Sequence, residues 1–247
     1  MVPDVQVRVF NFIPGELEDL ASSVLRSKTP ETVLPASDFA QLARYRTTET
    51  QAQYILSRRF LRDLLVELSD DPQYLHAPIT RTPEGKPELT DNSIFFNLSH
   101  TENAIAVIAS LKGHCGIDVQ STDKKLSYDK LAAKLLSKQE LEIYAKQPFQ
   151  LRESLFLRLF TLKEAYSKLQ GKGLAMKFST IDFSNRLTDV ARHAHGELPA
   201  GNQYKIYYRW ERVNLAFLCQ KNLNVNYKEL SAQEYLHQKI ILNKIVQ

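Results

Sequence analysis

Short extended segments in the middle of the chain limit most strongly what it can fold into. Strands are predicted at Ile94–Leu98, Ala104–Ala109 and Cys115–Val119, with only short turns between them. Residues Val5–Phe12 alternate between apolar and polar, which predicts a strand with one buried face. The last strand patterns lie toward the C-terminus, at Lys205–Trp210 and Val213–Cys219.

Helical patterns separate these strands. Apolar residues recur at helical spacing over residues 49–68 and 151–169, which predicts two long helices with one buried stripe each. A shorter helix begins at Ser137, because Ser137 and Glu140 form a capping-box pattern. The chain therefore mixes strands and helices throughout its length.

Three weaker helical signals complete the pattern. Ser37 and Asp38 are candidate N-caps of a helix through Arg44. Pro14 is expected to open a helix near the N-terminus. The polar tail contains a short helical candidate at Ser231–Ile245, to which the sequence assigns no role.

One internal similarity links the two ends of the chain. The segment Asn103–Ala109 resembles Asn214–Cys219, and each follows another strand and precedes a polar turn. Two similar α+β halves would explain this similarity. Alternating strands in unrelated positions also look alike, so the pattern by itself leaves duplication open.

Composition excludes several classes of protein. The 247 residues are 43% hydrophobic and 24% charged, as in ordinary globular proteins rather than disordered ones. No apolar run approaches the roughly 20 residues that span a bilayer, and the N-terminus lacks the apolar core of a signal peptide. We therefore expect a cytoplasmic protein that does not bind membranes. Its two cysteines, Cys115 and Cys219, are expected to be buried thiols.

The charge of the chain is mildly basic, with a formal net charge of +4. Such a charge would attract an acidic protein partner or a phosphate-rich ligand. It is too weak to indicate nucleic acid, and the sequence contains no zinc-ligand spacing, basic tail or aromatic RNA-binding motif. Alternatively, the slight excess of basic residues has no role in binding.

Two carboxylates are candidates for chemistry. Asp118 ends a strand on the face that it shares with Gly116 and Gln120, where a ligand or metal would have room; an exposed aspartate at a sheet edge is the alternative. Glu164 and Lys168 lie one helical turn apart, beside the apolar stripe of their helix. A solvated Glu–Lys pair is the alternative there.

Three further sites could bind phosphate. Residues 97–100, with Ser99 and His100, end a strand and enter a turn whose polar groups could hold a phosphate; a plain surface turn is the alternative. Lys86 lies in the turn Gly85-Lys86-Pro87. The basic residues Arg58, Arg59 and Arg62 follow one another closely on one predicted helix and could bind phosphates through forked hydrogen bonds.

Together these motifs resemble a known family. In chain order they are LARYRTTETQAQYILSRRFLRDLL, GKPEL, FNLSHT, GIDV and FTLKEAYSKLQGKGL. In this order and spacing they are similar to the 4'-phosphopantetheinyl transferases, in particular the long, surfactin-synthetase type. The resemblance covers roughly residues 42–183 and extends more loosely over the whole chain.

The resemblance implies an α+β fold and an activity. Members of the long type are monomers, pseudo-dimers of two similar halves with coenzyme A in the cleft between them. Here the halves would be residues 1–113 and 114–222, followed by a tail at 223–247. The family transfers the 4'-phosphopantetheine moiety of coenzyme A to a serine of an apo carrier protein and uses Mg²⁺. The carrier is an acidic acyl, polyketide or peptidyl carrier, and adenosine 3',5'-bisphosphate is released.

The resemblance also assigns roles to individual residues. It makes Asp118 and Glu164 metal ligands and places Gln120, where an acidic residue is common, as a weaker third ligand. It makes Glu164 the candidate base and Lys168 a contact to the phosphates at the bond that breaks. The expected coenzyme-binding residues are Arg58, Lys86, Ser99, His100 and Lys168. The neutral Gln120 leaves a non-catalytic coenzyme A-binding or nucleotide-binding relative as the alternative.

Overall fold

The computed structural model describes residues 3–13, 15–26, 34–122, 128–200, 203–211, 213–231 and 234–235. The strands are β1 (Val5–Asn11), β2 (Ile79–Arg81), β3 (Pro87–Leu89), β4 (Phe95–Thr101), β5 (Ala104–Ser110), β6 (Gly116–Ser121), β7 (His195–Ala200), β8 (Tyr204–Trp210), β9 (Val213–Gln220) and β10 (Val225–Ser231). The α-helices are α1 (Glu16–Arg26), α3 (Ala36–Leu42), α4 (Thr48–Ser69), α5 (Tyr128–Leu135), α6 (Lys138–Ala145), α7 (Phe149–Leu169) and α8 (Leu187–Arg192). None of the described helices is long and apolar enough to cross a bilayer.

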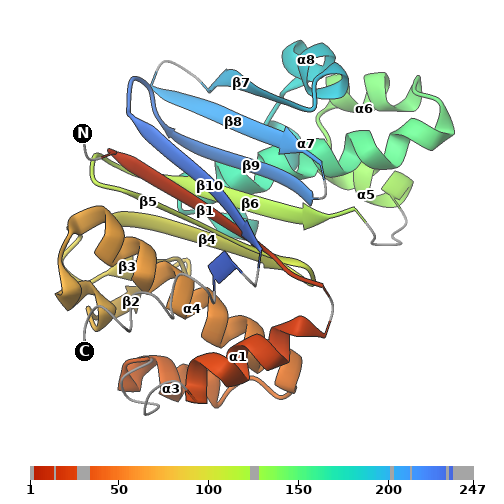
Figure 1. Cartoon of the computed structure of the whole chain (residues 1–247). Helices are drawn as coiled ribbons and strands as arrows, with labels where there is room; N and C mark the ends of the chain where they lie inside the picture. The colour runs from red at the N-terminus through yellow and green to blue at the C-terminus, as the bar shows by residue number, and fades with distance from the viewer. Residues whose placement is uncertain are drawn as a thin grey trace.

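Two four-stranded sheets form the centre of the molecule. Their strand orders are β10-β1-β5-β4 and β6-β9-β8-β7, and β2 and β3 form a separate hairpin (Figure 1). The sheets pack face to face through one apolar cluster, to which Val7 on β1, Ile108 on β5, Ile117 on β6 and Phe217 on β9 belong. Helix α4 covers the outer face of the first sheet and α7 that of the second. The result is four layers, with a helix on either side of two sheets.

The two sheets repeat one pattern of connections. In the first, the chain runs from β1 through α4 to the β4–β5 hairpin, and β5 pairs antiparallel with β1. In the second, it runs from β6 through α7 to the β8–β9 hairpin, and β9 pairs antiparallel with β6. The segments that look alike in the sequence therefore lie in β5 and β9, which hold equivalent places in the two sheets.

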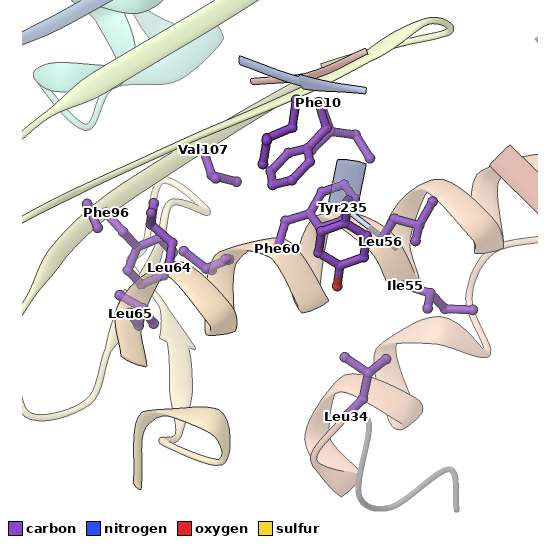
Figure 2. Close-up of a cluster of buried hydrophobic side chains, with 14 of the residues drawn as sticks. Phe10, Leu34, Ile55, Leu56, Phe60, Leu64, Leu65, Phe96, Val107 and Tyr235 are labelled. Carbon is purple, nitrogen blue, oxygen red and sulfur yellow. The ribbon is translucent and has the colours of Figure 1, made fainter. Parts of the chain in front are cut away.

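The segment after Asn222 returns to the first sheet. Strand β10 pairs in parallel with β1, residue for residue from Val5↔Val225 to Asn11↔Ser231. Beyond it, the ring of Tyr235 packs edge-on against Phe60, which stacks on Phe10 (Figure 2). The polar tail thus completes the N-terminal core. A helix was expected at 231–245. Ser231 instead belongs to β10, and most of the remaining range lies outside the described residues.

Three expectations from the sequence need correction. Strand β1 is buried along its whole length rather than on one face, because it lies inside its sheet and both faces of that sheet are covered. Pro35, not Ser37 or Asp38, is the N-cap of α3, and Asp38 is buried inside that helix. Residues 97–100 lie inside β4, which continues to Thr101, rather than at a strand end that enters a turn.

Several expectations are confirmed. Helices α4 and α7 match the two long helical patterns to within two residues at each end. Ser137 and Glu140 form the capping box of α6. Both cysteines are buried free thiols. The expected role of Pro14 falls on a residue outside the described part of the chain.

Candidate functional site

A glycine brings α7 into direct contact with β6. A Cβ atom on Gly116 would lie 2.2 Å from the carbonyl oxygen of Ala165 and 2.6 Å from the nitrogen of Leu169. Only a residue without a side chain allows the helix backbone to approach the strand so closely. This approach places Glu164 and Lys168 on α7 beside Asp118 on β6.

Asp118 is the centre of a polar cluster. Its side chain is only 2% exposed. Oδ1 accepts hydrogen bonds from Lys168 Nζ at 2.7 Å and from Ser99 Oγ at 2.8 Å, and Oδ2 accepts one from Gln120 Nε2 at 2.8 Å. The alternative of an exposed aspartate at a sheet edge is therefore excluded: β6 is an edge strand, but Asp118 faces α7.

Glu164 lies beside this cluster without a hydrogen bond from any described residue. Its side chain is 8% exposed. Burial, with a smaller contribution from the charge of Asp118, raises the pKa of Glu164 to about 7, although Lys168 acts in the opposite direction. A buried carboxylate with this pKa suits either proton transfer near neutral pH or a bound cation. The spacing of Glu164 and Lys168 suggested a solvated pair, but Lys168 binds Asp118 instead.

Strand β4 connects the two sheets at the site. Asn97 Oδ1 accepts a hydrogen bond from the backbone N–H of Ile117 at 3.1 Å. Ser99 Oγ accepts one from the backbone N–H of Val119 at 3.4 Å, in addition to one from Lys168 at 2.9 Å. The hydroxyl of Ser99 thus orients Asp118 and Lys168. Ser99 does not line the cavity described next, whereas its neighbour His100 does.

A cavity of about 360 Å³ adjoins the cluster. Its walls come from α4, the β2–β3 turn and β4 in the N-terminal half, and from the end of α7 in the C-terminal half. Four of the five residues expected to bind the coenzyme line it: Arg58, Lys86, His100 and Lys168. The structure therefore brings together residues that are up to 110 positions apart in the sequence.

Only one of the three neighbouring arginines on α4 is available to a ligand. Arg59 is paired with Asp63 at 2.9 Å, and Arg62 is fully buried and paired with Asp38 at 2.8 Å. Arg58 lines the cavity, and its buried Nη1 has no hydrogen-bond partner among the described residues. Of the three, Arg58 is therefore the one whose missing hydrogen bond a phosphate in the cavity could supply.

The oxygen atoms at the site suit a hard cation that keeps some of its water ligands. Asp118 and Glu164 supply carboxylate oxygens, and Gln120 supplies an amide oxygen if its amide group turns over. Within the described ranges no group of three or more His, Cys, Asp or Glu residues could hold a metal. A metal at this site would therefore depend on water or ligand oxygens for its other positions, as Mg²⁺ commonly does.

Sequence reasoning missed the role of Lys163, the neighbour of Glu164. Its side chain is fully buried, and Nζ lies 2.5 Å from Glu140 Oε2. It also donates to the carbonyl oxygens of Leu135, Phe178 and Ile181, at 3.2, 3.0 and 2.6 Å. Lys163 thus fixes α7 to α5, α6 and the following loop. The capping box at Glu140 was visible in the sequence, but this tertiary partner was not.

The cavity also has an aromatic wall that sequence reasoning missed. Tyr45 and Tyr54 line it, with ring centroids 5.1 Å apart. The guanidinium carbon of Arg58 lies 5.2 Å from the centroid of the Tyr54 ring. Aromatic faces beside a guanidinium suit a ligand that combines a flat ring with negative charge.

A sequence model of a known family matches part of the chain. Residues 114–217 match the sequence model of the 4'-phosphopantetheinyl transferase superfamily. This range contains Asp118, Gln120, Glu164 and Lys168, and it ends before the last strand. The match therefore covers α7 and the polar cluster except Ser99, whereas most of the cavity wall lies outside it.

Individual relatives extend the similarity into the N-terminal half. The chain is 34% identical to a Synechocystis sp. protein that carries the name 4'-phosphopantetheinyl transferase as a provisional assignment, over 59% of this chain and 60% of that protein. It is 26% identical to the 4'-phosphopantetheinyl transferase HetI of Nostoc sp., over 72% of each chain. It is 33% identical to the 4'-phosphopantetheinyl transferase AcpT of Salmonella typhimurium, over 40% of this chain and 52% of that protein.

Proposed function

We propose that this protein transfers the 4'-phosphopantetheine moiety of coenzyme A to a serine of an apo carrier protein. The observation that carries the proposal is the polar cluster around Asp118 and Lys168, with Glu164 beside it, next to a cavity whose walls carry Arg58 and Lys86. Similarity to 4'-phosphopantetheinyl transferases supports the same activity. Since one chain supplies both sides of the cavity, the proposal includes a monomeric enzyme of the long type.

The shape and charge of the cavity suit coenzyme A. The ligand has an adenine ring, a ribose phosphate and a pyrophosphate, and the cavity offers tyrosine rings and several cations for them. In this arrangement Lys168 and His100 bind the pyrophosphate, and Arg58 and Lys86 bind the nucleotide end. The pantetheine arm then extends from the polar cluster toward the carrier protein.

The reaction is a displacement at the β-phosphorus of the pyrophosphate. The serine oxygen of the carrier forms a bond to this phosphorus, and the bond from the phosphorus to the bridging oxygen breaks. Adenosine 3',5'-bisphosphate leaves with the electron pair. Lys168 donates hydrogen bonds to phosphate oxygens and stabilises their charge, and Asp118 and Ser99 hold its ammonium group in place.

Glu164 is the group that takes the proton of the attacking serine, directly or through one water molecule. Without a bound cation, burial raises the pKa of Glu164 to about 7, which makes it a stronger base than an exposed glutamate; a cation bound beside it would lower this pKa and keep the carboxylate ionised. Its side chain is buried where α7 packs against β6. The proton of the serine hydroxyl is therefore accepted within the polar cluster rather than by bulk water.

Magnesium is part of the proposal. Asp118 and Glu164 would hold the ion, with Gln120 as a weaker third ligand, and the ion would neutralise charge on the pyrophosphate oxygens. In the structure Lys168 and Gln120 already bind both oxygens of Asp118, so their hydrogen bonds rearrange or are shared when a cation binds.

The test is incubation of the protein with coenzyme A, Mg²⁺ and an acidic apo carrier protein. The proposal predicts that the carrier gains the mass of one phosphopantetheine group, and that a carrier with its acceptor serine changed to alanine gains none. A chain that binds coenzyme A but leaves the carrier unmodified would instead be a non-catalytic binding relative, for which the neutral Gln120 is the specific argument.

A further inference from the structure

Asp38 lies behind the wall of the cavity and organises it. The residue is on α3 and is 4% exposed. Its Oδ2 accepts hydrogen bonds from Arg62 Nε at 3.0 Å and Nη2 at 2.8 Å, and its Oδ1 accepts one from the hydroxyl of Tyr54 at 3.2 Å. Asp38 does not line the cavity, whereas Tyr54 does. It is therefore placed to act on a ligand only through its neighbours.

Two guanidinium groups share this one carboxylate. Arg62, which is fully buried, takes both bonds to Oδ2 and also donates to the carbonyl oxygen of Ala77 at 3.1 Å. Arg58 Nε lies 3.8 Å from Asp38 Oδ1, and within the described part of the chain the buried Nη1 of Arg58 has no hydrogen-bond partner. One positive charge therefore remains at the cavity wall. A buried charge without a partner is costly, so the arrangement favours an anion in the cavity.

We propose that Asp38 is a positioning residue that selects substrates with a phosphate monoester at the nucleotide end. It neutralises Arg62, attracts Arg58 Nε and fixes the Tyr54 ring over which the Arg58 guanidinium lies. Arg58 is thereby held at the cavity wall, with a buried Nη1 to which no described residue is hydrogen-bonded. This inference rests on the proposed function, since coenzyme A is the ligand whose ribose carries such a monoester.

The same helix carries a second pair that provides a matched control. Arg59 donates to Asp63 from Nε at 3.1 Å, and the hydroxyl of Tyr235 donates to Asp63 at 3.1 Å. Like the first pair, this is an Asp–Arg pair that also binds a tyrosine hydroxyl. Neither Arg59 nor Asp63 lines the cavity. Loss of this pair affects stability without reaching the ligand.

The experiment compares the affinities for coenzyme A and for 3'-dephospho-coenzyme A by calorimetry. The test variant is Asp38→Leu/Arg62→Met, and the control variant is Asp63→Leu/Arg59→Met. Each double change removes one negative and one positive charge, so the net charge of the site is unchanged. Asp38→Asn/Arg62→Gln, which keeps hydrogen-bonding side chains, replaces the test variant if circular dichroism shows that variant to be unfolded.

The wild-type protein is expected to prefer coenzyme A over the dephospho compound by at least about tenfold, since a charge-assisted hydrogen bond is at stake. The test variant is expected to lose most of this preference, with its affinity for the dephospho compound within about threefold of wild type. The control variant keeps the preference. With a carrier substrate, the KM for coenzyme A rises in the test variant while kcat stays close to wild type.

A test variant with the wild-type preference would overturn the role of Asp38. Arg58→Met provides the second criterion, because Asp38 acts through Arg58: if this change leaves the preference intact, the inference fails as well. Both failures are separable from failure of the proposed function. Formation of holo carrier protein by the wild-type chain establishes the transfer activity whatever the variants show.

Discussion

The ammonium group of Lys168 lies 2.7 Å from Asp118 Oδ1, which joins the end of α7 to β6. The sequence alone favours a different partner, because Glu164 is one helical turn from Lys168. The side chain of Glu164 is buried beside this pair and has no hydrogen bond to any described residue. Asp118 and Lys168 therefore form an ion pair, whereas the neighbouring Glu164 does not take part in it.

The first prediction concerns the metal ligands. Asp118→Ala is expected to reduce transfer at least about 100-fold, because it removes a charged oxygen ligand and the partner that holds Lys168. Gln120→Ala should cost much less, since a neutral amide binds Mg²⁺ weakly, and Gln120→Glu should lower the Mg²⁺ concentration needed for half-maximal rate. Transfer rates measured against Mg²⁺ concentration check all three. Equal losses in Asp118→Ala and Gln120→Ala would contradict the assignment of ligands.

The second prediction concerns the pH dependence of stability through Glu164. Its folded pKa of about 7 lies above the ordinary glutamate pKa of 4.5, so the folded state binds the proton more tightly than the unfolded state. Its contribution to stability is therefore present at low pH and is lost as pH rises from about 4.5 to 7. When a chelator removes metal, we expect the unfolding free energy of Glu164→Gln to rise by roughly 2 kcal/mol relative to that of the wild type over this pH interval. Urea unfolding at several pH values measures the gap, and a gap that is independent of pH would refute the prediction.

The third prediction concerns the buried pair of Lys163 and Glu140. Lys163→Met leaves a fully buried carboxylate without its cation and is expected to cost about 3–5 kcal/mol of unfolding free energy. The double variant Lys163→Met/Glu140→Gln should recover part of that loss, because no unpaired charge remains. Denaturant unfolding of both variants provides the measurement. A single variant as stable as wild type would show that the pair does not fix α7.

The fourth prediction concerns the contact between α7 and β6. Gly116→Ala places a methyl group against the backbone of α7 and should cost about 3 kcal/mol and reduce transfer strongly, because Glu164 and Lys168 move with the helix. Gly196→Ala is the control. Its methyl group would also meet close atoms, those of the Tyr208 phenol, but it lies on β7, at the opposite edge of the sheet from β6. Equal activity in the two variants would contradict the importance of this contact.

Sequence patterns predicted the parts of the fold that depend on local periodicity. Helices α4 and α7 and the strands of both hairpins follow from the spacing of their apolar residues. The role of β10 could not be predicted in this way, because its pairing with β1 joins residues more than 200 positions apart. The buried state of Asp38 was missed for a related reason: an acidic residue near a helix start suggests a cap, and its partner Arg62 is on another helix.

The candidate site shows the same division. Asp118, Glu164 and Lys168 were identified through a resemblance of motifs, and the structure places them together. The partner of Lys168, the bridging position of Ser99 and the buried pair at Lys163 depend on how α7 packs against other elements. Gly116 is the one local feature that reflects this packing. Its lack of a side chain is explained only by the close approach of the α7 backbone, which the sequence does not reveal.

The central claim is that the chain transfers phosphopantetheine rather than only binding its donor. The most direct measurement quantifies holo carrier protein by mass spectrometry and adenosine 3',5'-bisphosphate by chromatography in the same reaction. The account predicts that wild-type protein forms the two products in equal amounts, and that Asp118→Ala and Glu164→Ala form little of either. Release of the nucleotide without modified carrier, or full transfer by Asp118→Ala, would contradict it.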